Sequence, residues 1–256
     1  MCGISGFVLK KTEKNFCLES LIKMVSTLAH RGPNNKGYWK NNEDTQFIGH
    51  TRLSILDLSE KGSQPMISSS GNYVISYNGE IYNHLEIRKF LNQKKNIKWK
   101  STSDTETILE AIDIIGIDET IKKLHGMFAF CVIDIKKNLL YLVRDKFGEK
   151  PLYYGFSSSK FLFASELKGI ISFPNFQKKI NKKSLNYYFN LSYIPEPHSI
   201  FENIFKLEAG TILTFDLNKN LILSNEKFIT LIEKKDLNIS NKNSVDLLDQ
   251  TLNSVV

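Results

Sequence analysis

Residues 127–165, MFAFCVIDIKKNLLYLVRDKFGEKPLYYGFSSSKFLFAS, give the clearest indication of the fold class of this chain. They contain strand-like apolar runs at 127–133, 139–143, 151–155 and 161–165, with polar turns at 134–138 and 157–160. Connections this short join antiparallel strands, because parallel strands need a crossover of about a dozen residues or more. The stretch therefore predicts an antiparallel sheet made of consecutive strands.

Outward from this sheet, the N-terminal half alternates apolar strands with amphipathic helices. The apolar stripe over residues 19–29 predicts a helix that ends at the glycine and proline of 30–33. We expect further strands at 2–9, 47–51 and 73–77, and further helices at 83–93 and 103–115. Helices that flank antiparallel strands define an α+β fold, not a doubly wound α/β fold.

Local signals mark the ends of these elements. Asn78–Gly79 is expected to form the turn that closes the strand at 73–77. Asn83 and Ser103, each with a glutamate three residues later, resemble capping boxes at the starts of the two later helices.

The last part of the chain differs in character. Residues 233–243 are charged and rich in asparagine, which is typical of a linker, and Ser244 opens an apolar helical stripe. That stripe reaches the last residues without a stop signal, so we expect this sequence to be a fragment of a longer protein. The interpretation divides the chain into a folded domain over 1–228 and, over 229–256, a linker with the first helix of another domain.

Composition excludes several classes of protein. Of the 256 residues, 41% are apolar and 24% are charged, as in ordinary folded domains. The longest apolar run, 127–133, is far shorter than the ~20 residues of a membrane span, and the N-terminus lacks a secretory leader, so we expect a cytoplasmic protein. The three cysteines form no metal or disulfide pattern; we expect Cys17 and Cys131 to be buried and no metal to be bound.

The positive charge of the chain reflects a general use of lysine and does not indicate a nucleic-acid-binding surface. The formal charge is +7, but only four of the 34 basic residues are arginine, and the lysines are dispersed. We therefore expect neither nucleic acid nor membrane as a partner. Because the chain otherwise uses lysine, each arginine is a candidate for a specific role. The four arginines are at positions 31, 52, 88 and 144.

Cys2 is the strongest candidate for chemistry. Because Cys2 and Gly3 are small, the initiator methionine can be trimmed, leaving a cysteine with a free α-amine whose reference pKa is about 7.7 to 8.0. One residue would then supply the nucleophile and the base that takes its proton. The remaining residues offer no separate arrangement of histidine with aspartate or asparagine.

Other polar residues fit a site for an amino acid. Asn78 and the backbone of Gly79 can stabilise an oxyanion; the sequence pattern alone favours a simple turn, and a turn can also present both donors. Arg52 and Asp104 can hold a carboxylate and an ammonium group, respectively. Arg144–Asp145 is interpreted as an internal ion pair at a turn.

Several of these stretches, in order along the chain, resemble glutamine-hydrolysing asparagine synthetase. They are residues 1–7 (MCGISGF), 30–33 (HRGP), 51–55 (TRLSI), 77–83 (YNGEIYN), 103–106 (SDTE) and 144–154 (RDKFGEKPLYY), extended by 165–168 (SELK) and 193–195 (YIP). The resemblance implies a class II glutamine amidotransferase domain of the N-terminal-nucleophile type, with two stacked antiparallel sheets between helical layers (αββα).

The resemblance also implies roles for individual residues. Cys2 attacks the glutamine side-chain amide, and Asn78 and Gly79 donate to the oxyanion. The glutamine-binding residues are Arg52, Leu53, Ser54, Ile55, Leu56, Asn78, Gly79, Glu80 and Asp104. Arg52 holds the carboxylate, Asp104 holds the ammonium group with Glu80 nearby, and residues 53–56 bind through their backbone. Asn34 stands where the family more often has aspartate, which bears on any charge-dependent role there.

The expected reaction is hydrolysis of glutamine to glutamate and ammonia without a cofactor. In the family, a C-terminal domain then uses ATP and Mg to convert aspartate to asparagine; its Ser-Gly-Gly-x-Asp-Ser loop does not occur in these 256 residues. Another acceptor, such as a carboxylated sugar in polysaccharide biosynthesis, stays open, as does a homodimer. Phosphoribosyl pyrophosphate and fructose 6-phosphate fit the motifs less well. Alternatives without catalysis are a lysine-rich binding module and a degenerate domain.

Overall fold

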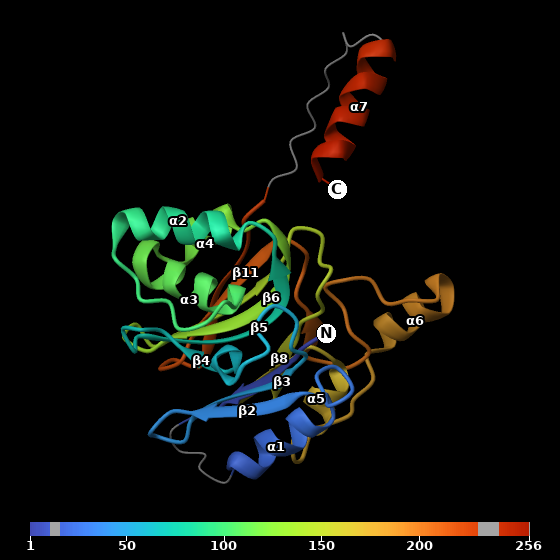
Figure 1. Cartoon of the computed structure of the whole chain (residues 1–256). Coiled ribbons are helices and arrows are strands. Elements are labelled where there is room, and N and C mark those ends of the chain that lie inside the picture. The colour runs from blue at the N-terminus through green and yellow to red at the C-terminus, as the bar shows by residue number, and fades with distance from the viewer. Residues whose placement is uncertain (11–15, 230–240, 256) are drawn as a thin grey trace.

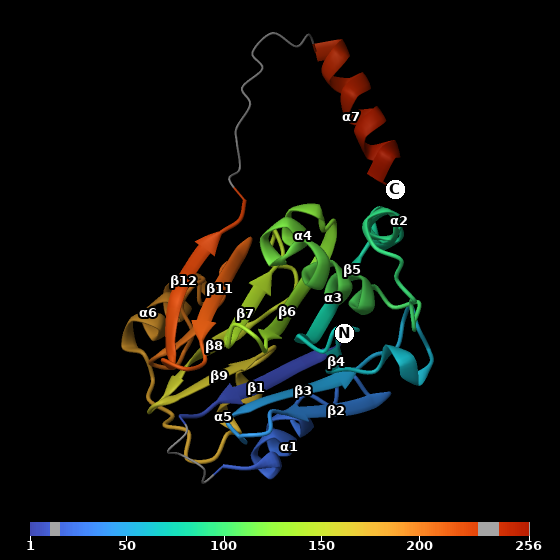
Figure 2. The same ribbon diagram turned by 90° about the vertical axis from the view of Figure 1, so that its left-hand side faces the viewer.

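Two antiparallel sheets stack face to face and carry helices on their outer faces (Figures 1 and 2). The computed structural model describes residues 1–10, 16–229 and 241–255. Every strand pair within the described residues is antiparallel. The α+β class and the αββα layering predicted from the sequence are confirmed.

In each sheet, strands from distant parts of the chain become neighbours. The first sheet has the order β10 (Ile204–Lys206), β8 (Tyr153–Ser157), β9 (Lys160–Ala164), β1 (Gly3–Val8), β3 (Gln46–Arg52), β2 (Asn35–Lys40). The second has the order β12 (Leu221–Lys227), β11 (Thr211–Asp216), β7 (Leu139–Arg144), β6 (Gly126–Asp134), β5 (Tyr73–Ile81), β4 (Met66–Ile67). The first strand of the chain thus lies inside its sheet, between β9 and β3.

The helices lie outside the two sheets (Figure 1). They are α1 (Leu18–Ser26) and α5 (Leu167–Ile171) on the first sheet, and α2 (His84–Lys94), α3 (Asp104–Ile115) and α4 (Ile117–Lys123) on the second. A short 3-10 helix (Glu60–Gly62), α6 (Lys182–Leu191) and α7 (Asn241–Val255) complete the described elements. Most of the predicted linker at 233–243 lies outside the described residues.

Three apolar cores separate these layers. The middle core joins the facing sides of the sheets, and Phe161 of β9 stacks on Phe215 of β11 with ring centroids 4.1 Å apart. The outer cores pack Leu21 and Met24 of α1 on the first sheet, and Ile108 and Leu109 of α3 on the second. Burial on both faces explains why the strands at 127–133 and 139–143 show no regular alternation of polar residues.

Some sequence predictions were wrong at the ends of elements. Asn78 and Gly79 do not form a turn: β5 continues to Ile81, and Gly79 pairs with Phe128 of β6. A side chain at Gly79 would overlap the backbone oxygen of Met127, so glycine is needed for close strand approach. β8 begins at Tyr153, two residues later than predicted.

The two predicted capping boxes have different outcomes. Asn83 makes no side-chain cap for α2; its amide instead bonds Lys123 O and His125 N. Ser103 does cap α3, accepting from Thr105 N at 3.1 Å. Glu106 reaches back past it to the N–H groups of residues 100 and 101.

Two further predictions need correction. Cys131 is buried as expected, whereas Cys17, at the start of α1, is exposed.

The acid paired with Arg144 is Glu196, at 2.6 Å, and not the adjacent Asp145. Asp145 instead accepts hydrogen bonds from backbone N–H groups of the turn that follows it. Arg144 and Asp145 are therefore buried at a turn, as predicted, but they do not pair with each other. Arg144 pairs with Glu196, and Asp145 accepts from backbone N–H groups.

Candidate active site

A cavity of about 270 Å³ opens at the end of the two sheets where β1 begins. It is lined by Met1, Cys2, Arg52, Leu53, Ile55, Leu56, Asp57, Gly62, Gln64, Tyr77, Asn78, Gly79, Glu80, Ser103, Asp104, Thr105, Met127 and Lys150. Nine of the ten residues predicted to form the site are in this set; Ser54 is not. The size is close to the lower end of the roughly 300–1,000 Å³ typical of small-molecule sites.

Cys2 reaches the cavity because β1 pairs with β3 in the middle of the first sheet. Gly3 lies opposite Thr51, which places Cys2 beside the chain that leaves β3. The Cys2 Sγ accepts from Leu53 N at 3.4 Å and lies 3.7 Å from Leu53 O. Burial raises the pKa of the Cys2 thiol; the Leu53 backbone, the terminal amine and Arg52 act in the opposite direction.

The backbone of Cys2 is fixed by an arginine that we did not predict as a site residue. Arg31 Nε donates to Cys2 O at 2.8 Å, and its Nη1 pairs with Glu166 at the same distance. The rarity of arginine in this chain was the signal that could have identified it. Arg31 therefore ties the start of β1 to the turn after α1 and to the start of α5.

Asn78 presents an unsatisfied amide to the site. The residue is 1% exposed, and its Nδ2 has no hydrogen-bond partner among the described residues. Buried amide donors are ordinarily paired, and leaving one unpaired costs about 1–3 kcal/mol. Since Asn78 lines the cavity beside Cys2, a bound group with an acceptor oxygen can satisfy this donor.

Asp104 is held at the start of α3, on the wall of the cavity. Its Oδ2 accepts from Tyr77 Oη at 2.7 Å and from Ile81 N at 2.9 Å. Burial raises the pKa of the Asp104 carboxyl, while the bonds from Tyr77 and Ile81 lower it. A cation bound at this carboxylate would gain a charge-assisted contact in a largely buried setting.

Arg52 is buried in the lining of the cavity, and two nitrogens of its guanidinium already donate to backbone carbonyls. Nη1 donates to Ser59 O at 2.7 Å, and Nη2 donates to Asp57 O. Guanidinium has five N–H donors, so these contacts leave others for a ligand. Arg52 thus shapes the loop that follows β3 as well as lining the site.

The loop over residues 53–56 lines the cavity only in part. Leu53, Ile55 and Leu56 are in the lining, whereas Ser54 N turns away and donates to Asn34 Oδ1 at 3.0 Å. A neutral amide oxygen is sufficient for this bond. Asn34, where the resembled family more often has aspartate, therefore holds the loop without a charge.

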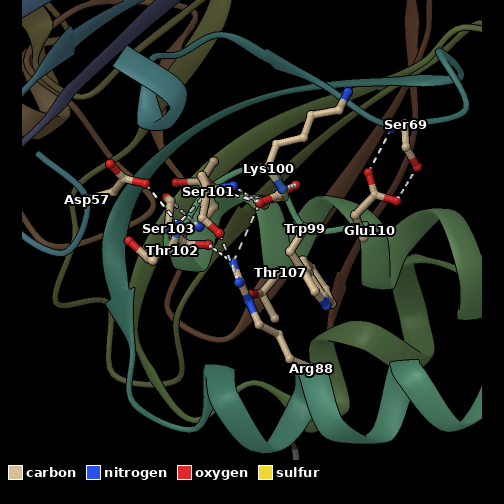
Figure 3. A network of polar contacts seen from close by, with 12 residues as sticks. Asp57, Ser69, Arg88, Trp99, Lys100, Ser101, Thr102, Ser103, Thr107 and Glu110 are labelled. Carbon is tan, nitrogen blue, oxygen red and sulfur yellow. Dashed lines mark hydrogen bonds and ion pairs between the residues drawn. The ribbon is translucent and has the colours of Figure 1, made fainter. Parts of the chain in front are cut away.

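The outer wall is held by a polar network (Figure 3). Arg88 of α2 donates to Ser101 O at 2.9 Å and to Ser103 O at 2.7 Å, and lies over the Trp99 ring. Asp57 Oδ2 accepts from Thr102 N at 2.9 Å. The network thus joins the loop after β3 to the segment that leads into Asp104.

Gln64 in the cavity and His50 behind it lie outside every motif quoted from the sequence. Tyr77 N donates to Gln64 Oε1 at 2.7 Å, and Gln64 Nε2 donates to Thr105 Oγ1 at 3.1 Å. Behind them, buried His50 Nε2 donates to Tyr77 O at 3.0 Å, and burial lowers the pKa of His50 to about 4. These side chains meet only through sheet pairing, so spacing along the chain could not reveal them.

Within residues 1–10, 16–229 and 241–255, no group of three or more His, Cys, Asp or Glu side chains could hold a metal ion. None of the helices over those ranges is both long and apolar enough to cross a membrane.

Comparison with known proteins agrees with the resemblance noted in the sequence. Residues 1–228 match the family described as "Glutamine amidotransferase domain". The chain is 42% identical over 240 residues to "Putative asparagine synthetase (glutamine-hydrolyzing) 2" of Methanocaldococcus jannaschii, and 36% identical over 218 residues to "Asparagine synthetase (glutamine-hydrolyzing) 3" of Bacillus subtilis. The alignments cover 87% and 84% of this chain, but only 45% and 35% of those relatives.

Solved structures agree at the level of the fold. The glutamine phosphoribosylpyrophosphate amidotransferase of B. subtilis superposes with a TM-score of 0.64, 17% sequence identity, and coverage of 90% of this chain and 50% of that chain. A structure described as the allosteric regulatory enzyme of purine biosynthesis gives a TM-score of 0.65 at 17% identity, with the same coverage. The family match spans most of the chain and includes every residue of the cavity. This chain therefore belongs to the family of glutamine amidotransferase domains.

Proposed function

We propose that this chain hydrolyses glutamine to glutamate and ammonia, with the Cys2 thiol as nucleophile after removal of Met1. The Cys2 α-amine takes the thiol proton, and the thiolate attacks the side-chain amide carbon. The resulting tetrahedral intermediate expels ammonia, which takes a proton from the α-ammonium, and leaves a thioester. Water then cleaves the C–S bond, giving glutamate and restoring the thiol.

The observation that carries this proposal is the pairing of a thiol with an unsatisfied amide in one cavity. Cys2 directly precedes β1 of the first sheet and Asn78 lies in β5 of the second, and both line the same cavity. The buried Nδ2 of Asn78 lacks a partner among the described residues, as expected for a donor reserved for a transient oxyanion. Gly79 N–H is the second proposed donor.

The remaining contacts would orient glutamine. Arg52 binds the α-carboxylate with the donors that Ser59 and Asp57 leave free, and Asp104 binds the α-ammonium, with Glu80 nearby. The backbone of residues 53–56 borders the substrate. In this segment Ser54 can offer the substrate only its backbone carbonyl oxygen, because its N–H is bonded to Asn34 Oδ1.

We further propose that the ammonia serves ATP-dependent conversion of aspartate to asparagine in a longer protein. The names of the relatives and the share of their length that this chain spans support this acceptor. In this proposal residues 1–228 form the glutaminase domain, and residues 229–256 form a linker and the first helix of the synthetase domain. ATP and Mg would bind that second domain.

The direct test is glutamate release from glutamine by the purified chain, with its N-terminal mass recorded. A chain that begins at Cys2 should turn over glutamine, and Cys2→Ala should abolish turnover with an unchanged circular dichroism spectrum. Cys17→Ala is the matched control, because Cys17 is exposed and outside the cavity. Unchanged turnover in Cys2→Ala would refute the mechanism.

The acceptor is tested on the longer protein. Asparagine formation from aspartate, ATP and glutamine is the expected result. Amide transfer to a carboxylated sugar instead would reassign the acceptor and leave the glutaminase proposal intact. Absence of turnover together with salt-sensitive polyanion binding would favour a lysine-rich binding module.

A further inference from the structure

Lys150 is a buried cation in the cavity without an acidic partner. It is 8% exposed, and its Nζ points to the N-terminus, 3.7 Å from Met1 Sδ. Within the described part of the chain, no carboxylate pairs with this ammonium. Burial of an unpaired ammonium is unfavourable, so its presence in the cavity calls for a functional reason.

Two hydrogen bonds, one to the backbone N–H and one to the carbonyl oxygen of Lys150, fix the position of this residue. Its N–H donates to Asp145 Oδ2 at 3.0 Å, and its carbonyl oxygen accepts from Arg144 Nε at 2.8 Å. Asp145 also accepts from Phe147 N and Glu149 N, which closes the turn. The internal network at this turn therefore presents one lysine to the start of β1.

We propose that the Lys150 ammonium lowers the pH at which the Cys2 amine–thiol pair loses its first proton, so that the reactive form is populated near neutrality. This inference rests on the proposed function. Amine and thiol lie on one residue and share protons, so the pair titrates as a unit. A neighbouring cation favours loss of a proton from this pair, whichever of the two groups releases it.

Other charged groups face the same pair, but their charges are partly offset. Arg31 donates to Cys2 O and is paired with Glu166, while Arg52 and Asp104 face the thiol with opposite charges. Glu80 is a further acid in the lining of the same cavity. Among the described residues no ion pair joins Lys150 to a carboxylate, so its ammonium faces the N-terminus without a directly paired acid.

The N-terminus with Met1 in place shows the same tendency. The pKa of its ammonium is lowered, first by burial and then by the charges of Arg31 and Lys150, while Cys2 raises it. Removal of Met1 makes the Cys2 nitrogen the terminal amine.

The experiment compares pH–rate profiles of kcat/KM for the chain that begins at Cys2. Lys150→Met should move the acid limb to higher pH by on the order of one unit, so that well below the midpoint the rate falls about tenfold. The plateau at high pH and KM should stay unchanged. Lys150→Arg should restore the midpoint, because it keeps the charge. Lys146→Met is the matched control, since Lys146 is exposed on the same turn.

A second readout does not depend on turnover. Alkylation of Cys2 by iodoacetamide requires the thiolate, so its pH midpoint should move upward in Lys150→Met by the same amount. A Cys17→Ala background removes the exposed competing thiol. If Lys150→Met does not fold by circular dichroism, Lys150→Gln replaces it, because glutamine keeps a polar group in the cavity.

The outcomes separate this inference from the proposed function. Unchanged midpoints in both readouts would overturn the role of Lys150, as would a higher KM at every pH without a midpoint shift, which would make Lys150 a substrate contact. Failure of Cys2→Ala to abolish turnover would instead refute the proposed function. The alkylation midpoint would still report on Lys150.

Discussion

All four arginines of this lysine-rich chain donate to backbone carbonyls around the site. The acceptors are Cys2 O for Arg31, Asp57 O and Ser59 O for Arg52, Ser101 O and Ser103 O for Arg88, and Gly148 O, Lys150 O and Leu207 O for Arg144. A planar fork can hold several fixed acceptors at once, whereas an ammonium on a flexible stem cannot; Arg31 joins one carbonyl to the Glu166 carboxylate, and the other three arginines each join at least two carbonyls. This requirement explains arginine at these positions independently of any substrate contact.

Asn78 carries the sharpest prediction for a single residue. Asn78→Ala should lower kcat by about 10²- to 10³-fold with little change in KM, because the lost donor acts on charge that develops in the transition state. Glutamate release at saturating and at limiting glutamine separates the two constants. Asn190→Ala, which removes an exposed amide on α6, should leave both unchanged. A rise in KM alone would make Asn78 a binding residue.

Two segments outside the regular strands form the outer wall of the site. The loop after β3 and the segment before α3 are joined where Asp57 accepts from Thr102 N, and Arg88 holds the second segment from behind. The position of Asp104 therefore depends on α2, an element that contributes no residue to the cavity lining.

Arg88→Lys tests this dependence at the scale of the element. Lysine keeps the charge but cannot donate to Ser101 O and Ser103 O together, so the free energy of unfolding should fall by about 1–3 kcal/mol. KM for glutamine should rise as Asp104 loses its support. Urea unfolding and steady-state kinetics measure the two effects. Lys89→Met is the control, because Lys89 is the exposed neighbour of Arg88 on α2. An unchanged KM in Arg88→Lys would show that substrate binding does not depend on the Arg88 hydrogen bonds.

At the scale of the whole molecule, the site exists only where both sheets meet. Cys2 precedes a strand of the first sheet and Asn78 belongs to a strand of the second, so their proximity depends on the core between the sheets. The stacked rings of Phe161 and Phe215 are part of that core.

Phe161→Ala should lower the free energy of unfolding by about 3–5 kcal/mol, because it leaves a cavity between the sheets. Glutaminase activity should disappear at the same, lowered, urea concentration as the fold. Leu223→Ala on the exposed face of β12 should change stability by at most about 0.5 kcal/mol. Loss of activity well before loss of the fold would show that the site is less stable than the core.

The fold class and most residues of the candidate site can be predicted from the order and type of residues along the chain. Short polar turns between apolar runs require antiparallel strands, and Cys2, Arg52, Asn78 and Asp104 have chemistry that suits an amino-acid substrate. These properties are local, because turn length, residue type and periodicity do not depend on the rest of the molecule.

Which residues line the cavity together, and which contacts each of them makes, became visible only in the folded molecule. The structure places Asn78–Gly79 inside β5 and not in a turn, and it exposes Cys17. It brings Lys150 to Met1 across 149 residues and Arg31 to Cys2 across 29 residues. The physical reason is that sheet order and the packing of one sheet on the other set these contacts, and neither is encoded in the spacing of residues along the chain.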